Sequence, residues 1–297
     1  MQSAFRGRVA LKAIAKCRNP TEAVFIIRSF SSNADAFREV VMSRRSCKRF
    51  QPHDKLDEGT LLDILEQTMV RLHSHMIHFR RSILISQRSP TGFNLQPYTI
   101  VLATSEQSKA ALADACLGAN GFRVRDAPVT AVFAADLEAL QRVDSVVSME
   151  RAAGAPEGYL SSLPFQAAAF ATGPLPRLAS MLRGSVIRAA SAVTPMPTAQ
   201  SPTAWAYKQT MIAASTFMLS ATSHGLASCA MEGFDSHRVA KALDIPSRYE
   251  VPVIISIGTP HSDDPTKNKT SPRFPISDMV RRDTFAFPYK AGPSNKR

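Results

Sequence analysis

The sequence predicts an α+β domain, in which a β-sheet is flanked by helices. Three apolar runs have the length and composition of buried strands: residues 99–103, 129–134 and 253–258. They are separated by helical patterns, of which residues 205–223 form the longest, Ala-rich and apolar nearly all round. With 297 residues, 44% of them hydrophobic, the chain is long enough for one large domain or two small ones.

The net charge of +12 is concentrated in three segments. Residues 1–34 carry +5, residues 69–86 carry +3 and residues 267–297 carry +6, whereas the remainder sums to −2. Because the body of the chain is nearly neutral, the charge does not indicate a nucleic-acid-binding face, and we expect no nucleic-acid partner. No apolar run is long enough to span a bilayer.

Residues 1–34 are predicted to be a mitochondrial-type targeting segment. Six Lys and Arg residues are spread among apolar residues, Glu22 is the only acid, and a serine-rich stretch lies at residues 29–32. This composition is typical of mitochondrial transit peptides, and a disordered basic arm is the alternative. The four cysteines lack disulfide or metal spacing, which favours free thiols in a reducing compartment. We therefore expect a mitochondrial localisation.

The first predicted helix of the domain, residues 34–42, leads into a basic loop at residues 43–50. This loop places four cations within six residues: Arg44, Arg45, Lys48 and Arg49. A solvated run of charge is the usual explanation for such a cluster. These cations lie between apolar helices, however, and Ser46 can donate a hydrogen bond, so a bound phosphate would relieve their mutual repulsion.

An amphipathic helix is predicted over residues 57–68, with acidic residues in its first turn. The next segment, residues 69–86, contains His73, His75 and His78, but no carboxylate or cysteine. We therefore predict no metal site in this segment.

Residues 89–98 form a loop with unusual local chemistry. Pro90 restricts φ, Gly92 permits positive φ, and Asn94 supplies a hydrogen-bond donor and acceptor. By itself, such a loop is most simply an ordinary connection between a helix and a strand.

Beyond the strand at residues 99–103, a helix is predicted over residues 105–117, with Ser105 as its N-cap. Residues 118–128 are expected to form a polar loop, which contains Asn120 and Arg123. The two glycines of this loop do not make a dinucleotide-binding fingerprint, because the G-x-G-x-x-G spacing is absent here and throughout the chain.

The later part of the chain combines a weak pattern with several clear signals. Residues 137–202, rich in Ala, Pro and Ser, are expected to form a variable helical excursion. Gly225 is expected to end the 205–223 helix, and residues 228–232 to be extended. A short helix capped by Asp235 or Ser236 is predicted to follow.

Four motifs, in this order, resemble the FMN-dependent nitroreductase family, especially its oxygen-insensitive branch. They are the Arg-Arg-Ser loop, the Pro-Thr-Gly-Phe-Asn-Leu-Gln-Pro loop, the Asn120/Arg123 segment and the Glu-Gly-Phe-Asp turn before the last strand. The resemblance covers about residues 35–290. It implies a nitroreductase-like three-layer sandwich, with a central mixed sheet flanked by helices, over residues 35–297. It also implies a homodimer with two FMN sites at its interface.

The resemblance assigns a role to each motif. The family's phosphate and ribityl contacts match Arg44, Arg45, Ser46 and Lys48, with Lys269 and Arg273 of the tail closing over the phosphate. The loop that contacts the flavin from the other subunit matches Pro90, Thr91, Gly92 and Asn94. Asn120 and Arg123 match the polar pair at the pyrimidine edge of the ring, and Glu232 and Gly233 match the turn whose backbone faces flavin N5.

The implied activity is a two-electron, ping-pong reduction of nitro or quinone compounds by NADH or NADPH. Because the flavin carries the chemistry, we expect no dedicated catalytic acid or base, and Arg123 and Glu232 would tune the flavin. A fixed cation such as Arg123 would stabilise the negative charge that reduction places at the pyrimidine edge. The alternatives are a flavoenzyme of the same fold but different chemistry, such as a dehalogenase or an enoate reductase, and a non-catalytic basic binding protein.

Residues 69–86 depart from the family pattern, in which the second helix runs almost directly into the proline loop. Residues 64–68 would join residues 87–90 smoothly if this segment were absent. We hypothesise that these 18 residues are either a surface insertion or an intron retained in the gene prediction.

Overall fold

The computed structural model describes residues 33–68, 89–171, 177–198, 200–267, 269 and 271–287. The predicted targeting segment up to residue 32, and the segment 69–86 with its three histidines, lie outside the described residues. The contacts within the chain define two compact units, residues 1–267 and 268–297. The smaller unit contains one helical turn, α12 (Ile276–Met279).

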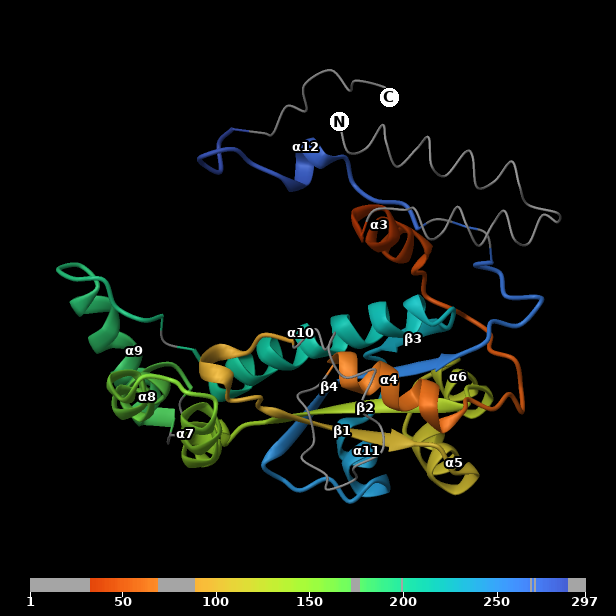
Figure 1. Cartoon of the computed structure of the whole chain (residues 1–297), viewed down its shortest axis with the longest axis horizontal. Helices are drawn as coiled ribbons and strands as arrows, with labels where there is room; N and C mark the ends of the chain where they lie inside the picture. The colour runs from red at the N-terminus through yellow and green to blue at the C-terminus, as the bar shows by residue number, and fades with distance from the viewer. Residues whose placement is uncertain are drawn as a thin grey trace. The chain divides into compact units, whose positions relative to one another are not determined.

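Four strands form one sheet in the larger unit, in the order β1-β2-β4-β3 (Figure 1). Their bounds are β1 (Tyr98–Ala103), β2 (Val129–Asp136), β3 (Ala227–Met231) and β4 (Tyr249–Gly258). The sequence predicted all four, although β4 begins four residues before the expected run. We expected a mixed sheet, but all three strand pairs are antiparallel. The parallel contact in the described chain is an isolated bridge between Ser46 and Ser228.

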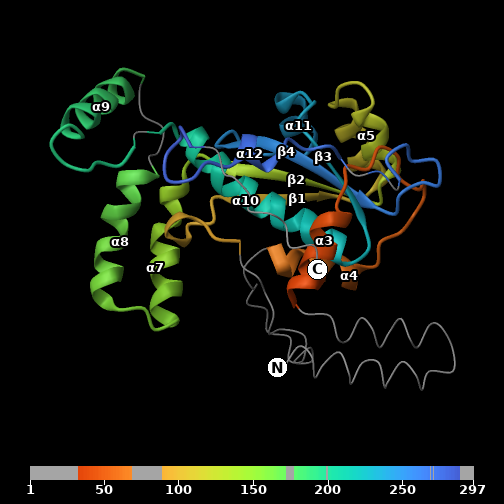
Figure 2. The same cartoon turned by 90° about the horizontal axis from the view of Figure 1, so that it is seen from above.

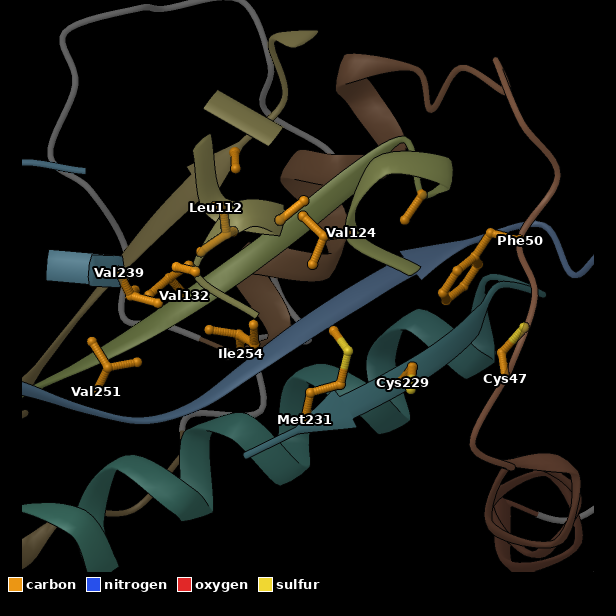
Figure 3. Close-up of a cluster of buried hydrophobic side chains, with 14 residues drawn as sticks. Cys47, Phe50, Leu112, Val124, Val132, Cys229, Met231, Val239, Val251 and Ile254 are labelled. Carbon is orange, nitrogen blue, oxygen red and sulfur yellow. The ribbon is translucent and has the colours of Figure 1, made fainter. Parts of the chain in front are cut away.

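Helices cover both faces of this sheet, as the three-layer prediction required. Figure 2 shows α4 (Glu58–Thr68) and α10 (Pro202–Ser223) on one side of the strands, and α5 (Glu106–Asp114) and α11 (Ser236–Ala242) on the other. Phe133 and Ile255 pack with Phe217 of α10, with the two phenyl rings 5.6 Å apart. Their strand neighbours Val132 and Ile254 belong to the opposite core (Figure 3). The alternation of strand side chains therefore fills two separate cores.

The predicted helix signals are confirmed where they depend on local hydrogen bonds. Ser105 caps α5, because its hydroxyl oxygen accepts from the backbone N–H of Ser108. Asp235 caps α11, because its side chain accepts from the backbone N–H groups of His237 and Arg238. Gly225 adopts φ +77° just after α10, the left-handed conformation that commonly follows a helix C-terminus.

The predicted polar loop at residues 118–128 is wrong, because α6 (Asn120–Asp126) forms within it. Gly121 accounts for this difference. A Cβ atom on Gly121 would lie 2.9 Å from the carbonyl oxygen of Ala113, so this glycine permits close packing of α6 on α5 rather than a turn.

The helical excursion begins with the 3₁₀ turn η2 (Ala139–Arg142) and continues as α7 (Val143–Ala152), α8 (Glu157–Phe170) and α9 (Arg177–Ala190). A third core joins it to the start of α10: Val146 and Leu163 pack with Trp205 and with Leu95 of the proline loop. Before the basic loop, α3 (Asn33–Ser43) lies where a first helix was predicted. The helices in the described part of the chain are all too short or too polar to cross a membrane.

The end of β4 gives a test of this packing. A Cβ atom on Gly258 would lie 2.4 Å from Cδ of Pro128, so Gly258→Ala should lower the free energy of unfolding by roughly 1–3 kcal/mol through overpacking. Gly158 in α8 has no atom within 4 Å of such a Cβ, and Gly158→Ala should leave stability unchanged or increase it by up to about 1 kcal/mol. Denaturant unfolding of both variants measures the difference, and equal stability of Gly258→Ala and the wild type would contradict the close approach.

Candidate functional site

The basic loop after α3 runs along the outer edge of β3, the edge strand of the sheet. The N–H of Cys47 donates to the carbonyl oxygen of Ser228 at 2.9 Å, next to the bridge formed by Ser46. A second bridge, between Phe50 and Pro260, holds the end of the loop. The backbone of the basic loop is therefore fixed beside the sheet, with Arg44 and Arg45 partly buried and Lys48 and Arg49 exposed.

One buried carboxylate, Asp264, lies among these cations. Its side chain has no exposed surface, and Oδ2 lies 3.5 Å from Nη2 of Arg45. Burial by itself would raise the pKa of Asp264, but hydrogen bonds donated by Thr266, Lys48 and Cys47 outweigh it and lower the pKa. Sequence reasoning missed Asp264. Its only signal was an acidic pair soon after the last apolar strand.

Three buried polar atoms near the basic loop and α6 have no hydrogen-bond partner: Nε of Arg45, Oγ of Ser228 and Nε of Arg123. The charges of Arg123 and Lys48 both act on the thiol of Cys229 in β3, lowering a pKa that burial raises. Cys47 of the basic loop, Val124 of α6 and Cys229 of β3 belong to one buried cluster, so these three elements lie together (Figure 3). Unpaired buried donors are costly, and an anionic or strongly polar ligand would satisfy them.

The other side of this region is built by α6 and the turn after β3. Asn120 and Arg123 lie one turn apart on α6, and Asn120 Nδ2 donates to the carbonyl oxygen of Gly233 at 3.0 Å. Arg123 Nη1 donates in turn to Oδ1 of Asn120. A Cβ atom on Gly233 would lie 2.8 Å from Asn120 Nδ2, so this approach requires glycine. Glu232, beside it, is exposed. The structure thus brings together two predicted pairs, Asn120/Arg123 and Glu232/Gly233.

The proline loop lies at the other end of the sheet. Ser228, beside the basic loop, pairs with Ile257, which pairs with Val129 at the start of β2. The proline loop leads into Tyr98, which pairs with Ala135 near the end of β2. Six residues of β1 separate the two ends, a span of about 20 Å. Within one chain, the proline loop does not join the other predicted site residues.

The proline loop has an ordered but strained backbone. Phe93, Asn94 and Gln96 have φ of 56°, 54° and 46°, a conformation that costs a non-glycine residue about 1 kcal/mol or more. Side chains of the neighbouring helices hold it: the N–H of Gly92 donates to Oε1 of Gln209 in α10, and Nδ2 of Asn94 donates to Oε1 of Glu150 in α7, both at 2.8 Å. The hydroxyl of Thr91 accepts from the N–H of Gln96 at 3.0 Å.

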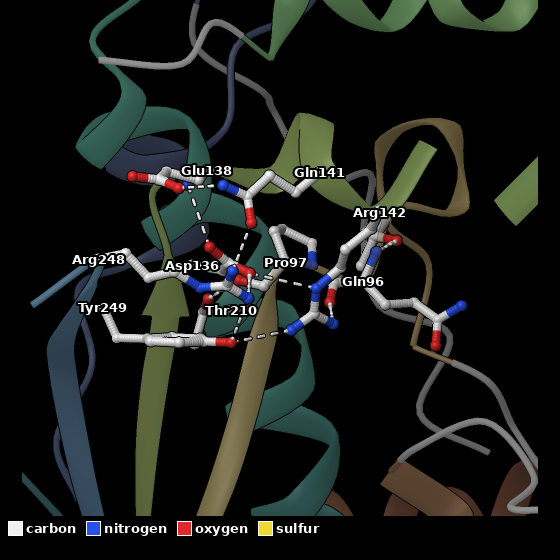
Figure 4. A network of polar contacts seen from close by, with 10 residues as sticks. Gln96, Pro97, Asp136, Glu138, Gln141, Arg142, Thr210, Arg248 and Tyr249 are labelled. Carbon is white, nitrogen blue, oxygen red and sulfur yellow. Dashed lines mark hydrogen bonds and ion pairs between the residues drawn. The ribbon is translucent and has the colours of Figure 1, made fainter. Parts of the chain in front are cut away.

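A buried ion-pair network anchors the same loop to the sheet (Figure 4). Arg142 donates to the carbonyl oxygen of Gln96 at 2.6 Å and to Oδ2 of Asp136 at 3.2 Å. Arg248 contacts the same carboxylate oxygen at 3.1 Å, and Asp136 is fully buried. The local sequence pattern identified none of these three residues: Arg142 lies six residues after Asp136, but Arg248 reaches the same carboxylate from 112 positions away.

Lys269 and Arg273, predicted to close over a phosphate, belong to the smaller unit. Both are exposed, and Arg273 Nη1 donates to the carbonyl oxygen of Pro272 at 2.9 Å. Their predicted role remains a prediction.

Comparison with known proteins identifies relatives of this arrangement. Residues 41–259 match the sequence model of the nitroreductase family. A curated protein named NADH dehydrogenase, from Thermus thermophilus, is 28% identical over 220 residues, which cover 74% of this chain and 84% of the relative.

Two solved structures share the fold. The ydfN protein of Bacillus subtilis superposes with a TM-score of 0.62 at 20% identity, covering 84% of this chain and 100% of that chain. A protein of Exiguobacterium sibiricum, solved in complex with FMN, superposes with a TM-score of 0.57 at 19% identity, covering 83% and 96%. These likenesses confirm the predicted nitroreductase-like α+β fold.

The buried thiol of Cys47 gives a pH test of the geometry at the basic loop. Burial raises its pKa from 9.0 to about 12. Because the folded protein then binds this proton more tightly than the unfolded chain, the stabilisation is complete below pH 9 and is lost as the pH rises towards 12. Over this range, we expect the free energy of unfolding to fall less steeply with pH in Cys47→Ala than in the wild type. The two slopes should differ by up to about 1.4 kcal/mol per pH unit.

Urea unfolding at pH 8, 9, 10 and 11 measures this difference. Tyr207, whose pKa burial also raises to about 12, is present in both proteins and contributes the same background. Parallel stability profiles for the wild type and Cys47→Ala would contradict the buried, protonated thiol.

Proposed function

The chain belongs to the nitroreductase family of flavin oxidoreductases, and we propose that it uses FMN and NADH or NADPH to reduce nitro or quinone compounds in two-electron steps. The observation that carries this proposal is the meeting of the basic loop, β3 and α6 around buried donors without partners. These groups fit a ligand with a dianionic phosphate at one end and a polar ring at the other.

The basic loop suits the phosphate end of FMN. Arg44, Arg45, Ser46 and Lys48 would hold the phosphate and ribityl chain. The loop carries four cations, of which Arg45 is paired with the buried Asp264. The unpaired Nε of Arg45 supports the assignment, because guanidinium groups bind phosphate oxygens through two parallel hydrogen bonds.

The α6 face suits the ring end. When bound, FMN supplies the two-electron redox chemistry. Arg123 supplies a fixed positive charge, and Asn120 sets its direction while itself held by Gly233. We propose that this charge lies at the pyrimidine edge, where it stabilises negative charge without reorganisation. The backbone of Glu232 and Gly233 would face N5, and we assign no acid–base role to the Glu232 carboxylate.

The position of the proline loop supports a homodimer with two FMN sites at the interface. Pro90, Thr91, Gly92 and Asn94 are remote from the basic loop of their own chain, so a second copy would have to supply them to a site. The network behind the loop holds its strained backbone ready for such a contact. Exposed apolar residues on α3, α4 and α10 offer a surface for a second copy: Phe37, Met42, Leu62 and Ile212.

The nicotinamide donor and the acceptor are proposed to use the same flavin face in turn. The sequence lacks a dinucleotide-binding fingerprint, which fits a ping-pong reaction without a separate dinucleotide domain. The name of the Thermus thermophilus relative favours NADH as the donor.

We further propose that residues 1–34 target the protein to mitochondria and that residues 35–297 are the functional domain. Residues 69–86 are proposed to be a surface insertion or a retained intron. Mass spectrometry of peptides from the mature protein distinguishes these last two, because peptides from residues 69–86 would exclude the intron.

Purified protein should be yellow and should release FMN on denaturation. NADH or NADPH should bleach its visible absorbance, and a quinone or nitro compound should restore it. A colourless protein that takes up no FMN but binds nucleic acid in a salt-sensitive manner would support the basic binding protein instead. Turnover of a halogenated or enoate substrate, without quinone or nitro reduction, would favour the flavoenzymes of different chemistry.

Arg123→Ala should slow reduction of the bound flavin by NADH, by about tenfold or more, and should weaken FMN binding less than that. Arg125→Ala is the matched control, because Arg125 lies on the same helix but is half exposed and paired with Asp114. Stopped-flow reduction and FMN titration measure the two effects. Equal losses in rate and affinity, or a larger loss in affinity, would contradict the electrostatic role of Arg123.

A further inference from the structure

We propose that Asp264 is a positioning residue that shapes the basic loop at residues 44–49 to bind the phosphate of the cofactor. The proposal rests on the FMN-dependent function proposed above. Asp264 would support an anion-binding site by shaping it, although a carboxylate that acted only through its charge would repel the anion.

Asp264 contacts the basic loop through both backbone and side-chain groups. Its Oδ1 accepts from the N–H of Lys48 at 3.2 Å and from the N–H of Thr266 at 3.1 Å. Its Oδ2 lies 3.4 Å from the thiol of Cys47, whose single proton goes to this oxygen or to the carbonyl oxygen of Arg49 at 3.1 Å. Asp264 therefore contacts two consecutive residues of the loop, Cys47 and Lys48.

Thr266 extends this support to a third residue. Its hydroxyl oxygen lies 2.9 Å from Oδ2 of Asp264 and 3.1 Å from the carbonyl oxygen of Ser46. The hydroxyl has one proton, so it donates to one of these acceptors at a time. Through Asp264 and Thr266, the segment after β4 contacts the carbonyl oxygen of Ser46 and the N–H of Lys48.

The carboxylate also orients one guanidinium group and leaves one of its donors unpaired. Oδ2 of Asp264 contacts Nη2 of Arg45, whereas Nε of Arg45 remains buried and without a hydrogen-bond partner. The loop carries four cations, and only Arg45 is ion-paired with Asp264, so the loop keeps a net positive charge. Nη2 of Arg45 is thus held by Asp264, and Nε is left to donate to the phosphate.

Asp264→Asn separates positioning from charge, because the two roles predict effects of opposite sign. If Asp264 acts only as a nearby charge, its removal strengthens phosphate binding. If it positions the loop, binding weakens, because an amide NH₂ group cannot accept from the donors that now reach the carboxylate. We expect the affinity for FMN to fall by about tenfold or more, as for the loss of hydrogen bonds to a charged group.

The experiment titrates apoprotein with FMN and, separately, with riboflavin, which lacks the phosphate, and follows quenching of flavin fluorescence. Asp264→Asn should lose more affinity for FMN than for riboflavin, because the basic loop is assigned to the phosphate and the ribityl chain, and riboflavin keeps only the ribityl contacts. Asp263→Asn is the matched control, because it removes the same charge from the adjacent residue, whose side chain is 69% exposed. This control should bind both ligands as the wild type does.

Thr266→Val provides the second variant, because it keeps the charge of Asp264 and removes only the hydroxyl that joins Asp264 to Ser46. It should also weaken FMN selectively, and it carries the test if circular dichroism shows that Asp264→Asn does not fold. Unchanged or tighter FMN binding by the folded variants, or equal losses for FMN and riboflavin, would overturn the positioning role. A wild-type protein that binds neither flavin would instead overturn the proposed function.

Discussion

The attachment of the basic loop to the edge strand is the interaction on which the candidate site depends. Four cations within six residues repel one another, and a free loop would separate them. The buried carboxylate of Asp264 and the backbone contact between Cys47 and Ser228 hold them together instead. This arrangement leaves buried donors unpaired, an unfavourable state that a phosphate would relieve.

A second attachment gives the site its other wall. Asn120 links α6 to the turn at Gly233 and orients Arg123, so a helix and a strand end separated by more than 100 residues act as one unit. The basic loop and α6 both lie beside β3, and every residue of β3 pairs with β4. The apolar core beneath, which includes Met231 and Ile254, fixes the distance between the walls.

The proline loop illustrates a different use of buried charge. Its left-handed residues are unfavourable in isolation, and they persist because Asp136, Arg142 and Gln209 bind the surrounding backbone. The loop is rigid at the end of the sheet opposite to the basic loop. A flavin site that needs both loops therefore needs two chains, which links the proposed cofactor to the proposed dimer.

Local signals in the sequence determined the strands, the ends of α5, α10 and α11, and the clusters of residues that carry the family resemblance. Each of these depends on neighbouring residues: apolar runs, a Ser or Asp cap, a glycine after a helix. The antiparallel sheet, the helix α6 and the supporting acids Asp136 and Asp264 were decided only by tertiary structure. Gly121 permits close packing of α6 on α5, and Asp264 meets the basic loop across more than 200 residues. No local pattern records such contacts, because their energy depends on which distant groups the fold buries together.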